Sequence, residues 1–304
     1  MKSKHQPIYL AGQTGSGKTA VALELASSLA PVEIINADAY QIYRGLEILS
    51  AAPTAEEYAA APHHLFGIFD PSQECDAATF AKMAQEKIAE VSTRAIPLVV
   101  GGSGLYLKAI THGLAPTPQG DPRLRAELDQ GTLEELIARY EALDPAGAAA
   151  TNLKNRRYVT RNLEICLLAG RPASEIKSEW QRNQPDICAF YLEREREDIY
   201  ERINQRTHTM FEASVTAEVT ALGELSATAA KAIGLSEIQI HLSEETERDQ
   251  CIANIQQITR RYAKRQESWF RREPAFQRIQ VSLDQQPAAT VTKILAHLPD
   301  IDRH

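Results

Sequence analysis

The stretch AGQTGSGKTA, residues 11–20, constrains the fold more than any other feature of the sequence. Gly12, Gly17, Lys18 and Thr19 have the spacing G-x-x-x-x-G-K-[ST], in which backbone N–H groups surround phosphate oxygens and the lysine adds a positive charge. The preceding PIYLA predicts a short strand, and the following KTAVALELASSLA has apolar residues at helical spacing. A strand, a glycine loop and a helix N-terminus in this order predict a phosphate-binding loop (P-loop), which most often binds ATP or GTP.

Short apolar runs alternate with helical patterns over the first third of the chain. Runs at 7–11, 32–36 and 97–100 predict strands, and residues 77–93 predict a helix. This alternation is typical of parallel β-α units joined by right-handed crossovers.

The middle of the chain has a different character. Residues 121–184 are polar and helix-rich, whereas DICAFYL, residues 186–192, predicts a returning core strand followed by a helix over EDIYERINQRTHTMFEA. A long amphipathic helix is predicted at 251–271. We therefore predict an α/β fold: a P-loop NTPase-like parallel sheet core with C-terminal helices, formed by residues 1–120 and 185–304, and a helical insertion domain at residues 121–184.

Composition narrows the class of protein further. The 304 residues are 43% hydrophobic and 24% charged, which is typical of a soluble globular chain. No apolar segment resembles a membrane span or a secretory signal, so we expect a cytoplasmic protein without a membrane partner. The net charge of −7 argues against a generic nucleic-acid coat, although local basic patches remain. Four widely spaced cysteines, with no zinc-type spacing, are expected to be buried apolar residues: Cys75, Cys166, Cys188 and Cys251.

A feature that nucleotide-hydrolysing P-loop enzymes need is missing. Such enzymes hold Mg²⁺ with a carboxylate at the end of an apolar strand, and GTPases read guanine with N-K-x-D. Here the strand PLVV ends in GGSG, which places Gly101 and Gly102 where the carboxylate is expected, and N-K-x-D is absent. Asp38 instead follows the second predicted strand, at the sheet edge where ligands bind in open α/β folds.

Seven blocks of the sequence resemble, in order, the motifs of the bacterial tRNA dimethylallyltransferases. The resemblance spans residues 7–272, and its blocks are GQTGSGKT, NADAYQIYRG, APHHLFGIFDP, VVGGSGLYLKAI, DPRLRAEL, RNLEICLLAGRP and RRYAKRQESWF. That family transfers a dimethylallyl group from dimethylallyl diphosphate to N6 of adenine 37, beside the anticodon of tRNA. The resemblance implies that the P-loop holds a prenyl diphosphate, that Mg²⁺ is the cofactor and that the tRNA anticodon stem-loop is the partner; we expect a monomer.

The resemblance also implies a role for each residue of the site. The loop, with Mg²⁺ held in part by Thr19, would stabilise the charge on the departing diphosphate. Asp38 would accept the proton of the adenine amine, and Ser103, at the place of a family threonine, would put a hydroxyl nearby. Arg206 and Arg202 would reach the diphosphate, with a surface helix cation as the alternative for each. The predicted catalytic residues are Asp38, Ser103, Lys18 and Arg206, and the predicted diphosphate-binding residues are Gly12, Gln13, Thr14, Gly15, Ser16, Gly17, Lys18, Thr19 and Arg202.

Two basic patches and the residues after Asp38 are predicted to contact tRNA. NRRYVTR and TRRYAKRQESWFRR would bind the flanking phosphates, with an ion-paired solvent face as the alternative. Gln41 either reads the adenine edge or is a solvated loop residue. The predicted tRNA-binding residues are Ala39, Tyr40, Gln41, Arg156, Arg157, Arg161, Arg261, Arg265 and Gln266.

The sequence departs from the family pattern at several positions. Gln13 and Ala39 stand in the first two motifs where relatives have proline and serine, with small expected effects. Ala52 replaces a lysine, so we expect weaker substrate binding there, and Tyr158 replaces a common arginine and can stack on a base. The adjacent His63 and His64 favour a structural or RNA-adjacent role over metal binding.

Three alternative functions share parts of this pattern. An adenylate isopentenyltransferase has the loop and the aspartate, but a mononucleotide needs neither the helical insertion nor the basic helix. A P-loop small-molecule kinase would consume ATP. A non-catalytic RNA-binding module would keep the loop without using Asp38.

Overall fold

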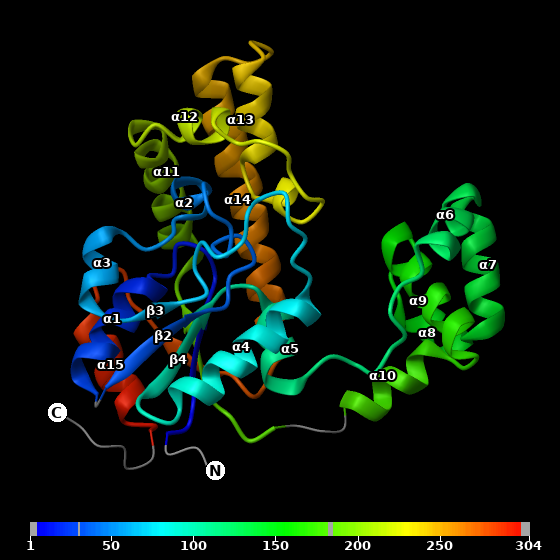
Figure 1. Cartoon of the computed structure of the whole chain (residues 1–304), viewed down its shortest axis with the longest axis horizontal. Helices are drawn as coiled ribbons and strands as arrows, with labels where there is room; N and C mark the ends of the chain where they lie inside the picture. Colours follow the sequence, from blue (N-terminus) through cyan, green and yellow to red (C-terminus); the bar gives the residue numbers. More distant parts are fainter. Residues whose placement is uncertain (1–4, 30, 182–184, 299–304) are drawn as a thin grey trace. The chain divides into compact units, whose positions relative to one another are not determined.

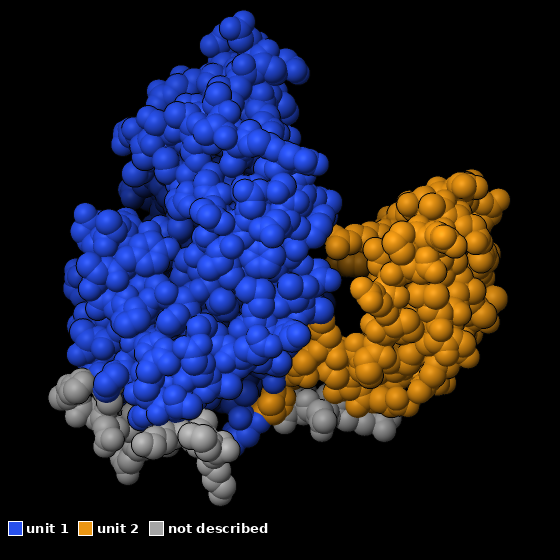
Figure 2. Space-filling view, in the orientation of Figure 1, with its two compact units in different colours: residues 1–111, 186–304 blue, residues 112–185 orange. Residues whose placement is uncertain are grey.

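The computed structural model describes residues 5–29, 31–181 and 185–298. The chain divides into two compact units, one of residues 1–111 and 186–304 and one of residues 112–185 (Figures 1 and 2). The second unit begins at His112, ahead of the predicted start of the insertion at Asp121.

The first unit is built on a parallel sheet of six strands in the order β3-β2-β4-β1-β5-β6 (Figure 1). The strands are β1 (Ile8–Gly12), β2 (Val32–Asn36), β3 (His63–His64), β4 (Ile96–Gly101), β5 (Cys188–Glu193) and β6 (Gln277–Gln280). β1 lies in the middle, where Leu10 pairs with Val100 of β4 and with Phe190 of β5. The predicted parallel α/β core is confirmed, and the P-loop leaves the sheet at its centre.

Helices cover both faces of the sheet. The helices of this unit are α1 (Lys18–Ser28), α2 (Glu47–Ser50), α3 (Ala55–Ala60), α4 (Ala77–Val91), α5 (Gly104–His112), α11 (Arg196–Glu212), α12 (Val215–Thr220), the 3₁₀ turn η1 (Ala229–Lys231), α13 (Leu235–Leu242), α14 (Arg248–Phe270) and α15 (Pro287–Leu295).

Alternate side chains of β1 enter two separate cores, as the two-residue period of a strand requires. Ile8 and Leu10 pack with α1 and α15, which lie side by side in Figure 1. Tyr9 and Ala11 enter the larger core on the other face, to which α4, α5, α13 and α14 contribute. Because both faces are covered, all residues of β1, β2 and β4 are buried.

The second unit is a bundle of helices with its own core. Its helices are α6 (Pro122–Gln130), α7 (Leu133–Leu143), α8 (Pro145–Ala150), α9 (Arg156–Ala169) and α10 (Ala173–Gln181). Thr132 and Glu135 form a capping box that begins α7, and Gly170 in the left-handed conformation ends α9. Leu128, Leu136 and Leu163 are buried together at the centre.

Among residues 5–29, 31–181 and 185–298, no helix combines the length and the apolar character that crossing a membrane requires.

Candidate active site

A cavity of about 570 Å³ opens at the carboxyl edge of the sheet in the first unit. Lys18 at the start of α1, Asp38 after β2 and Gly101 at the end of β4 form part of its wall. Arg206 of α11 and Tyr262 of α14 line it as well. This edge is the usual ligand site of open parallel sheets. The cavity therefore brings together the loop, the carboxylate and the arginine that the sequence analysis predicted as one site.

The P-loop has the conformation of an anion-binding loop. Gly15 and Gly17 have φ angles of 81° and 86°, which favour glycine, and α1 begins directly afterwards at Lys18. The ammonium group of Lys18 folds back on its own loop and donates to the carbonyls of Gly12 at 3.0 Å and Gln13 at 3.1 Å. The amide groups of the first turn of α1 have no acceptor within the helix, so they are available to a bound anion.

The charge of Lys18 is sensitive to its surroundings. Burial lowers the pKa of Lys18 to about 8, an effect that the carboxylate of Asp38 opposes and the guanidinium of Arg206 reinforces. A bound diphosphate would favour the protonated form, because it adds negative charge to a poorly solvated pocket.

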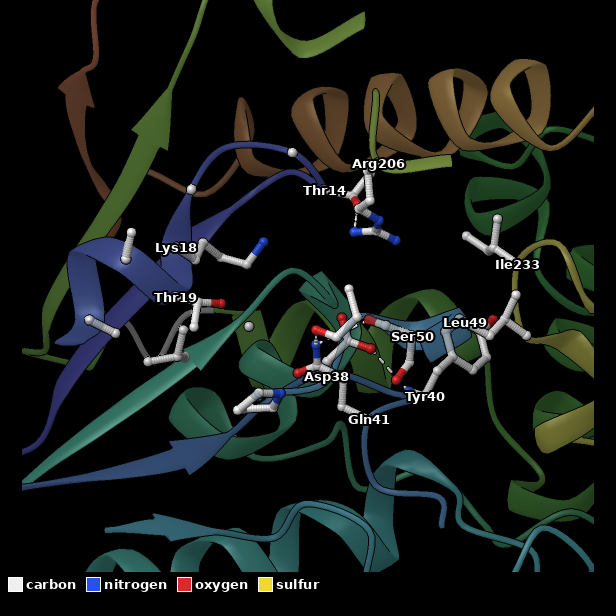
Figure 3. Close-up of a pocket in the computed structure, with 18 of the residues that line it drawn as sticks. Thr14, Lys18, Thr19, Asp38, Tyr40, Gln41, Leu49, Ser50, Arg206 and Ile233 are labelled. Atoms are coloured by element: carbon white, nitrogen blue, oxygen red, sulfur yellow. Dashed lines mark hydrogen bonds between the residues drawn. The ribbon is translucent and has the colours of Figure 1, made fainter. Parts of the chain in front are cut away.

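Arg206 enters the cavity from α11. Its Nη1 donates to the hydroxyl of Thr14 at 3.0 Å (Figure 3). Burial lowers the pKa of Arg206 and Asp38 raises it. Arg202 lines the same cavity one helical turn earlier, but its Nε donates to Asp198 at 2.8 Å. Arg206 is therefore aimed at the loop, whereas Arg202 is held by a carboxylate.

Asp38 lies across the cavity from Arg206 and Thr14 (Figure 3). Its Oδ1 accepts a hydrogen bond from the amide of Tyr40 at 3.0 Å, and its own amide donates to the side chain of Asn36 at 2.7 Å. Asn36 is fully buried at the end of β2 and also donates to the carbonyl of Leu65 at 2.9 Å. The carboxylate is therefore fixed at the edge of the sheet with one side facing the cavity.

The glycines after β4 allow close packing at the site. A Cβ on Gly101 would lie 2.1 Å from the carbonyl oxygen of Ala37, so no carboxylate-bearing residue fits there. A Cβ on Gly102 would lie 2.5 Å from the amide nitrogen of Gln266. Ser103 comes directly before α5 and is not among the cavity-lining residues of the described chain, unlike Gly101.

Two glutamines expected to contact tRNA have other partners. Gln41 lines the cavity, but its side-chain amide donates to the carbonyls of Ser50 at 3.2 Å and Ala51 at 2.8 Å. Gln266 is 5% exposed; its oxygen accepts from the amide of Thr14 at 2.9 Å and its nitrogen donates to the carbonyl of Gly102 at 2.8 Å. Both side chains therefore hold loops of the site together.

The residues near Gln41 complete that side of the cavity. Tyr40 lines it, and its pKa is raised by burial and by the nearby Asp38. Ala39 packs against the larger core beside Tyr40.

Some arginines of the basic helix α14 make contacts within the protein, and some are exposed to solvent. Arg260 donates to Asn204 at 2.7 Å, and Arg265 lies over the ring of Tyr262 at 5.6 Å. Arg261 and Arg265 are both exposed.

The predicted arginines of the second unit differ in the same way. Arg156 donates to the carbonyls of Leu128, Asp129 and Gly131, which end α6. Arg161 pairs with the buried carboxylate of Glu164 at 2.5 Å. Arg157 is exposed and leaves its side chain in solvent.

The paired histidines have structural contacts. His63 contacts the carbonyl of Ala61 at 2.7 Å, and His64 contacts Glu33 at 2.6 Å. Within residues 5–29, 31–181 and 185–298, no group of three or more His, Cys, Asp or Glu side chains forms a metal site. The four cysteines are free thiols, of which only Cys188 is partly exposed.

Two residues of the site were not singled out from the sequence. Tyr262 lies on the predicted amphipathic helix and lines the cavity, and burial and Asp38 raise its pKa. Arg194 follows β5 directly and donates from Nε to the carbonyl of Ser16 in the P-loop at 2.9 Å. Arg194 could have been found from the sequence, because it comes immediately after a predicted core strand, at the sheet edge that also holds Asp38.

Comparisons with known proteins show which family the chain resembles. The model of the IPP transferase family matches residues 41–273. The tRNA dimethylallyltransferase of Akkermansia muciniphila is 40% identical over 96% of this chain and 99% of its own length. The tRNA dimethylallyltransferase of Geobacter sulfurreducens is 38% identical over 90% of this chain and 91% of its own.

Solved structures are similar over the same extent. The full-length tRNA isopentenylpyrophosphate transferase of Bacillus halodurans superposes with a TM-score of 0.70 at 30% identity, covering 96% of this chain and 95% of that one. A eukaryotic dimethylallyltransferase crystallised acting on tRNA has a TM-score of 0.81 at 22% identity, and shares the fold. From these matches over nearly its whole length, the chain belongs to the IPP transferase family, the family of the tRNA dimethylallyltransferases.

Proposed function

We propose that the chain transfers the dimethylallyl group of dimethylallyl diphosphate to N6 of adenine 37 in tRNA, acting as a monomer in the cytoplasm. The observation that carries the proposal is that Lys18, at the start of α1, and Asp38, after β2, line one cavity (Figure 3). One end can bind an anion and the other can accept a proton.

The P-loop end of the cavity stabilises the leaving group. As the bond between C1 and oxygen of the allylic diphosphate breaks, its electron pair leaves with the diphosphate and negative charge grows on the oxygens. The amides of α1, the ammonium of Lys18 and the guanidinium of Arg206 surround the place where that charge develops. The positive charge on the prenyl fragment then faces the opposite wall of the cavity.

Mg²⁺ fits this end of the site. The hydroxyl of Thr19 lines the cavity beside Lys18, and a hydroxyl oxygen of this type suits Mg²⁺ together with substrate phosphates. A bound Mg²⁺ would neutralise part of the charge of the diphosphate.

Asp38 acts on the adenine. The exocyclic amine is a weak nucleophile because its lone pair is delocalised into the ring, so a carboxylate that orients it and removes its proton assists the reaction. As N6 forms the new bond to C1, its proton passes to the carboxylate of Asp38. The hydrogen bond from the Tyr40 amide keeps that carboxylate in place for the transfer.

The adenine must leave its stack to reach Asp38, which is least costly in a single-stranded loop. Exposed Arg261 and Arg265 on α14 and exposed Arg157 on α9 would bind phosphates of the flanking RNA. The helical unit of residues 112–185 would thereby serve as an RNA-binding unit.

Assays with alternative acceptors and donors test the proposal. The purified chain with Mg²⁺ and dimethylallyl diphosphate is offered an anticodon stem-loop RNA, and in a parallel reaction AMP. We expect N6-dimethylallyladenosine in the RNA and at least about 100-fold less product with AMP. Preferential modification of AMP would instead identify an adenylate isopentenyltransferase. Phosphoryl transfer from ATP without any prenyl product would identify a kinase.

A further inference from the structure

A buried arginine that has no part in the reaction scheme above donates a hydrogen bond to the backbone of the P-loop. Arg194 follows β5, is 8% exposed, and donates from Nε to the carbonyl oxygen of Ser16 at 2.9 Å. It is not among the residues that line the cavity with Lys18 and Asp38.

The contact fixes the direction of a peptide that faces the cavity. The carbonyl of Ser16 and the amide of Gly17 belong to one planar trans peptide unit, so they point in opposite directions. Holding the carbonyl toward Arg194 turns the amide of Gly17 away from Arg194. Gly17 lines the cavity beside Lys18 and precedes the first turn of α1. Its amide is thereby presented to an anion in the P-loop.

Arg194 is itself held in one orientation. Its Nη1 donates to Oδ2 of Asp198 at 2.5 Å and to the carbonyl of Ser282 at 3.2 Å. Asp198 is 7% exposed, and its Oδ1 accepts from Nε of Arg202 at 2.8 Å. Two guanidinium groups therefore share one carboxylate, which leaves a net positive charge beside the P-loop, and Arg202 carries part of it to the cavity wall.

We propose that Arg194 is a positioning residue for diphosphate binding, which acts through the Ser16–Gly17 peptide and is oriented by Asp198. The proposal rests on the proposed function for the identity of the ligand. It assigns a role in binding the prenyl donor, and none in binding the RNA, to a residue outside the cavity.

The test compares Arg194→Met with a matched control in the full chain. Methionine keeps most of the length of the side chain but removes every donor. The control is Arg278→Met, because Arg278 lies on the neighbouring strand β6, pairs with Glu193 and does not line the cavity. The Kd of inorganic diphosphate is measured by calorimetry, and KM is measured separately for dimethylallyl diphosphate and for an anticodon stem-loop RNA.

We expect Arg194→Met to raise the Kd of diphosphate and the KM of dimethylallyl diphosphate at least about 10-fold, comparable to the loss of one charge-assisted hydrogen-bond network. The KM for RNA should stay within about twofold, and Arg278→Met should match the wild type in all three values. Arg194→Lys, which keeps one donor but not the fork, should lie between. This separation of the two substrates would not arise from general destabilisation.

Wild-type diphosphate affinity in folded Arg194→Met would overturn the proposal, as would equal losses for both substrates. If Arg194→Met does not fold, Asp198→Asn takes its place, since it keeps the volume and removes the orienting charge. A rise of about 3-fold or more in the diphosphate Kd supports the proposal, and an unchanged Kd contradicts it. If the wild type itself neither binds diphosphate nor forms prenylated RNA, the proposed function fails. If the wild type is active and the variants bind diphosphate equally well, only the role of Arg194 fails.

Discussion

Arg206 donates a hydrogen bond from Nη1 to the hydroxyl of Thr14 at 3.0 Å, which connects the middle of α11 to the tip of the P-loop. Through this contact the guanidinium lies at the same anion site as Lys18, although the two cations come from distant parts of the sequence. The pair can therefore bind a diphosphate from two sides.

Replacement of Arg206 by methionine is expected to reduce kcat/KM for dimethylallyl diphosphate by about 10²–10³-fold, the usual cost of removing one preorganised donor to a developing anion. Steady-state kinetics with RNA at saturation measures the loss. Arg278→Met is the control, because that arginine pairs with Glu193 and does not line the cavity. A loss of less than about 3-fold for Arg206→Met would show that the arginine does not contact the diphosphate.

The affinity of the unliganded protein for the prenyl donor should fall above about pH 8. Burial lowers the pKa of Lys18 to about 8; Asp38 opposes this effect and Arg206 reinforces it. The ammonium therefore loses its proton above that pH. Binding of dimethylallyl thiodiphosphate should then weaken by up to about tenfold per pH unit and should take up a proton. Calorimetry in two buffers of different ionisation enthalpy measures the uptake. Lys18→Met should remove it, and uptake that persists in this variant would assign it to another group.

The lowered pKa of Lys18 also makes the free energy of unfolding depend on pH. The folded protein holds Lys18 with a pKa near 8, below the ordinary 10.5 of the unfolded chain. Between these values the unfolded chain binds more protons, so this group makes the free energy of unfolding rise as the pH increases.

Gln266→Leu should weaken binding of the diphosphate and leave RNA affinity nearly unchanged. The substitution removes the partners of the Thr14 amide and the Gly102 carbonyl, at a cost of about 1–3 kcal/mol for each buried group left without a hydrogen bond. Thermal unfolding and the Kd for diphosphate and for stem-loop RNA measure the three effects. A fall in RNA affinity alone would instead support the expectation from sequence that Gln266 contacts tRNA.

Two adjacent arginines of α9 should give opposite phenotypes. Arg157→Ala should weaken tRNA binding at low salt and reduce the salt slope by about 1, because the exposed side chain is free to meet a phosphate. Arg156→Ala should lower the free energy of unfolding by about 1–3 kcal/mol, because it leaves the end of α6 without its donor. Filter binding over a salt series, together with denaturant unfolding, separates the two. Identical salt slopes in wild type and Arg157→Ala would exclude that contact.

The central strands could be predicted because their side chains are continuously buried. Strands β1, β2, β4 and β5 begin and end within two residues of the predicted runs, since parallel strands covered on both faces consist mainly of apolar residues. β3 consists only of His63 and His64, and β6 buries only Ile279 among four residues. Neither carries enough apolar surface to form a pattern, because both lie at edges of the sheet.

Those residues of the site that are recognised by their spacing in the sequence could be predicted. The P-loop motif and the position of Asp38 after a strand both follow from local sequence, and the structure brings them to one edge. The partners of Arg156, Arg161 and Gln266 could not be predicted, because a charge or an amide in sequence does not show what it meets after folding. Arg156 meets backbone carbonyls, Arg161 a buried glutamate and Gln266 the P-loop.

The most direct measurement of the central claim is single-turnover transfer to a stem-loop RNA by the wild type and by Asp38→Asn, with both substrates saturating. Asparagine keeps the size of the side chain and cannot accept the proton of N6, so the rate should fall by about 10²–10⁴-fold while the Kd of diphosphate and of RNA change little. An unchanged rate in Asp38→Asn would contradict the account, because the carboxylate across from the P-loop would then have no part in the reaction.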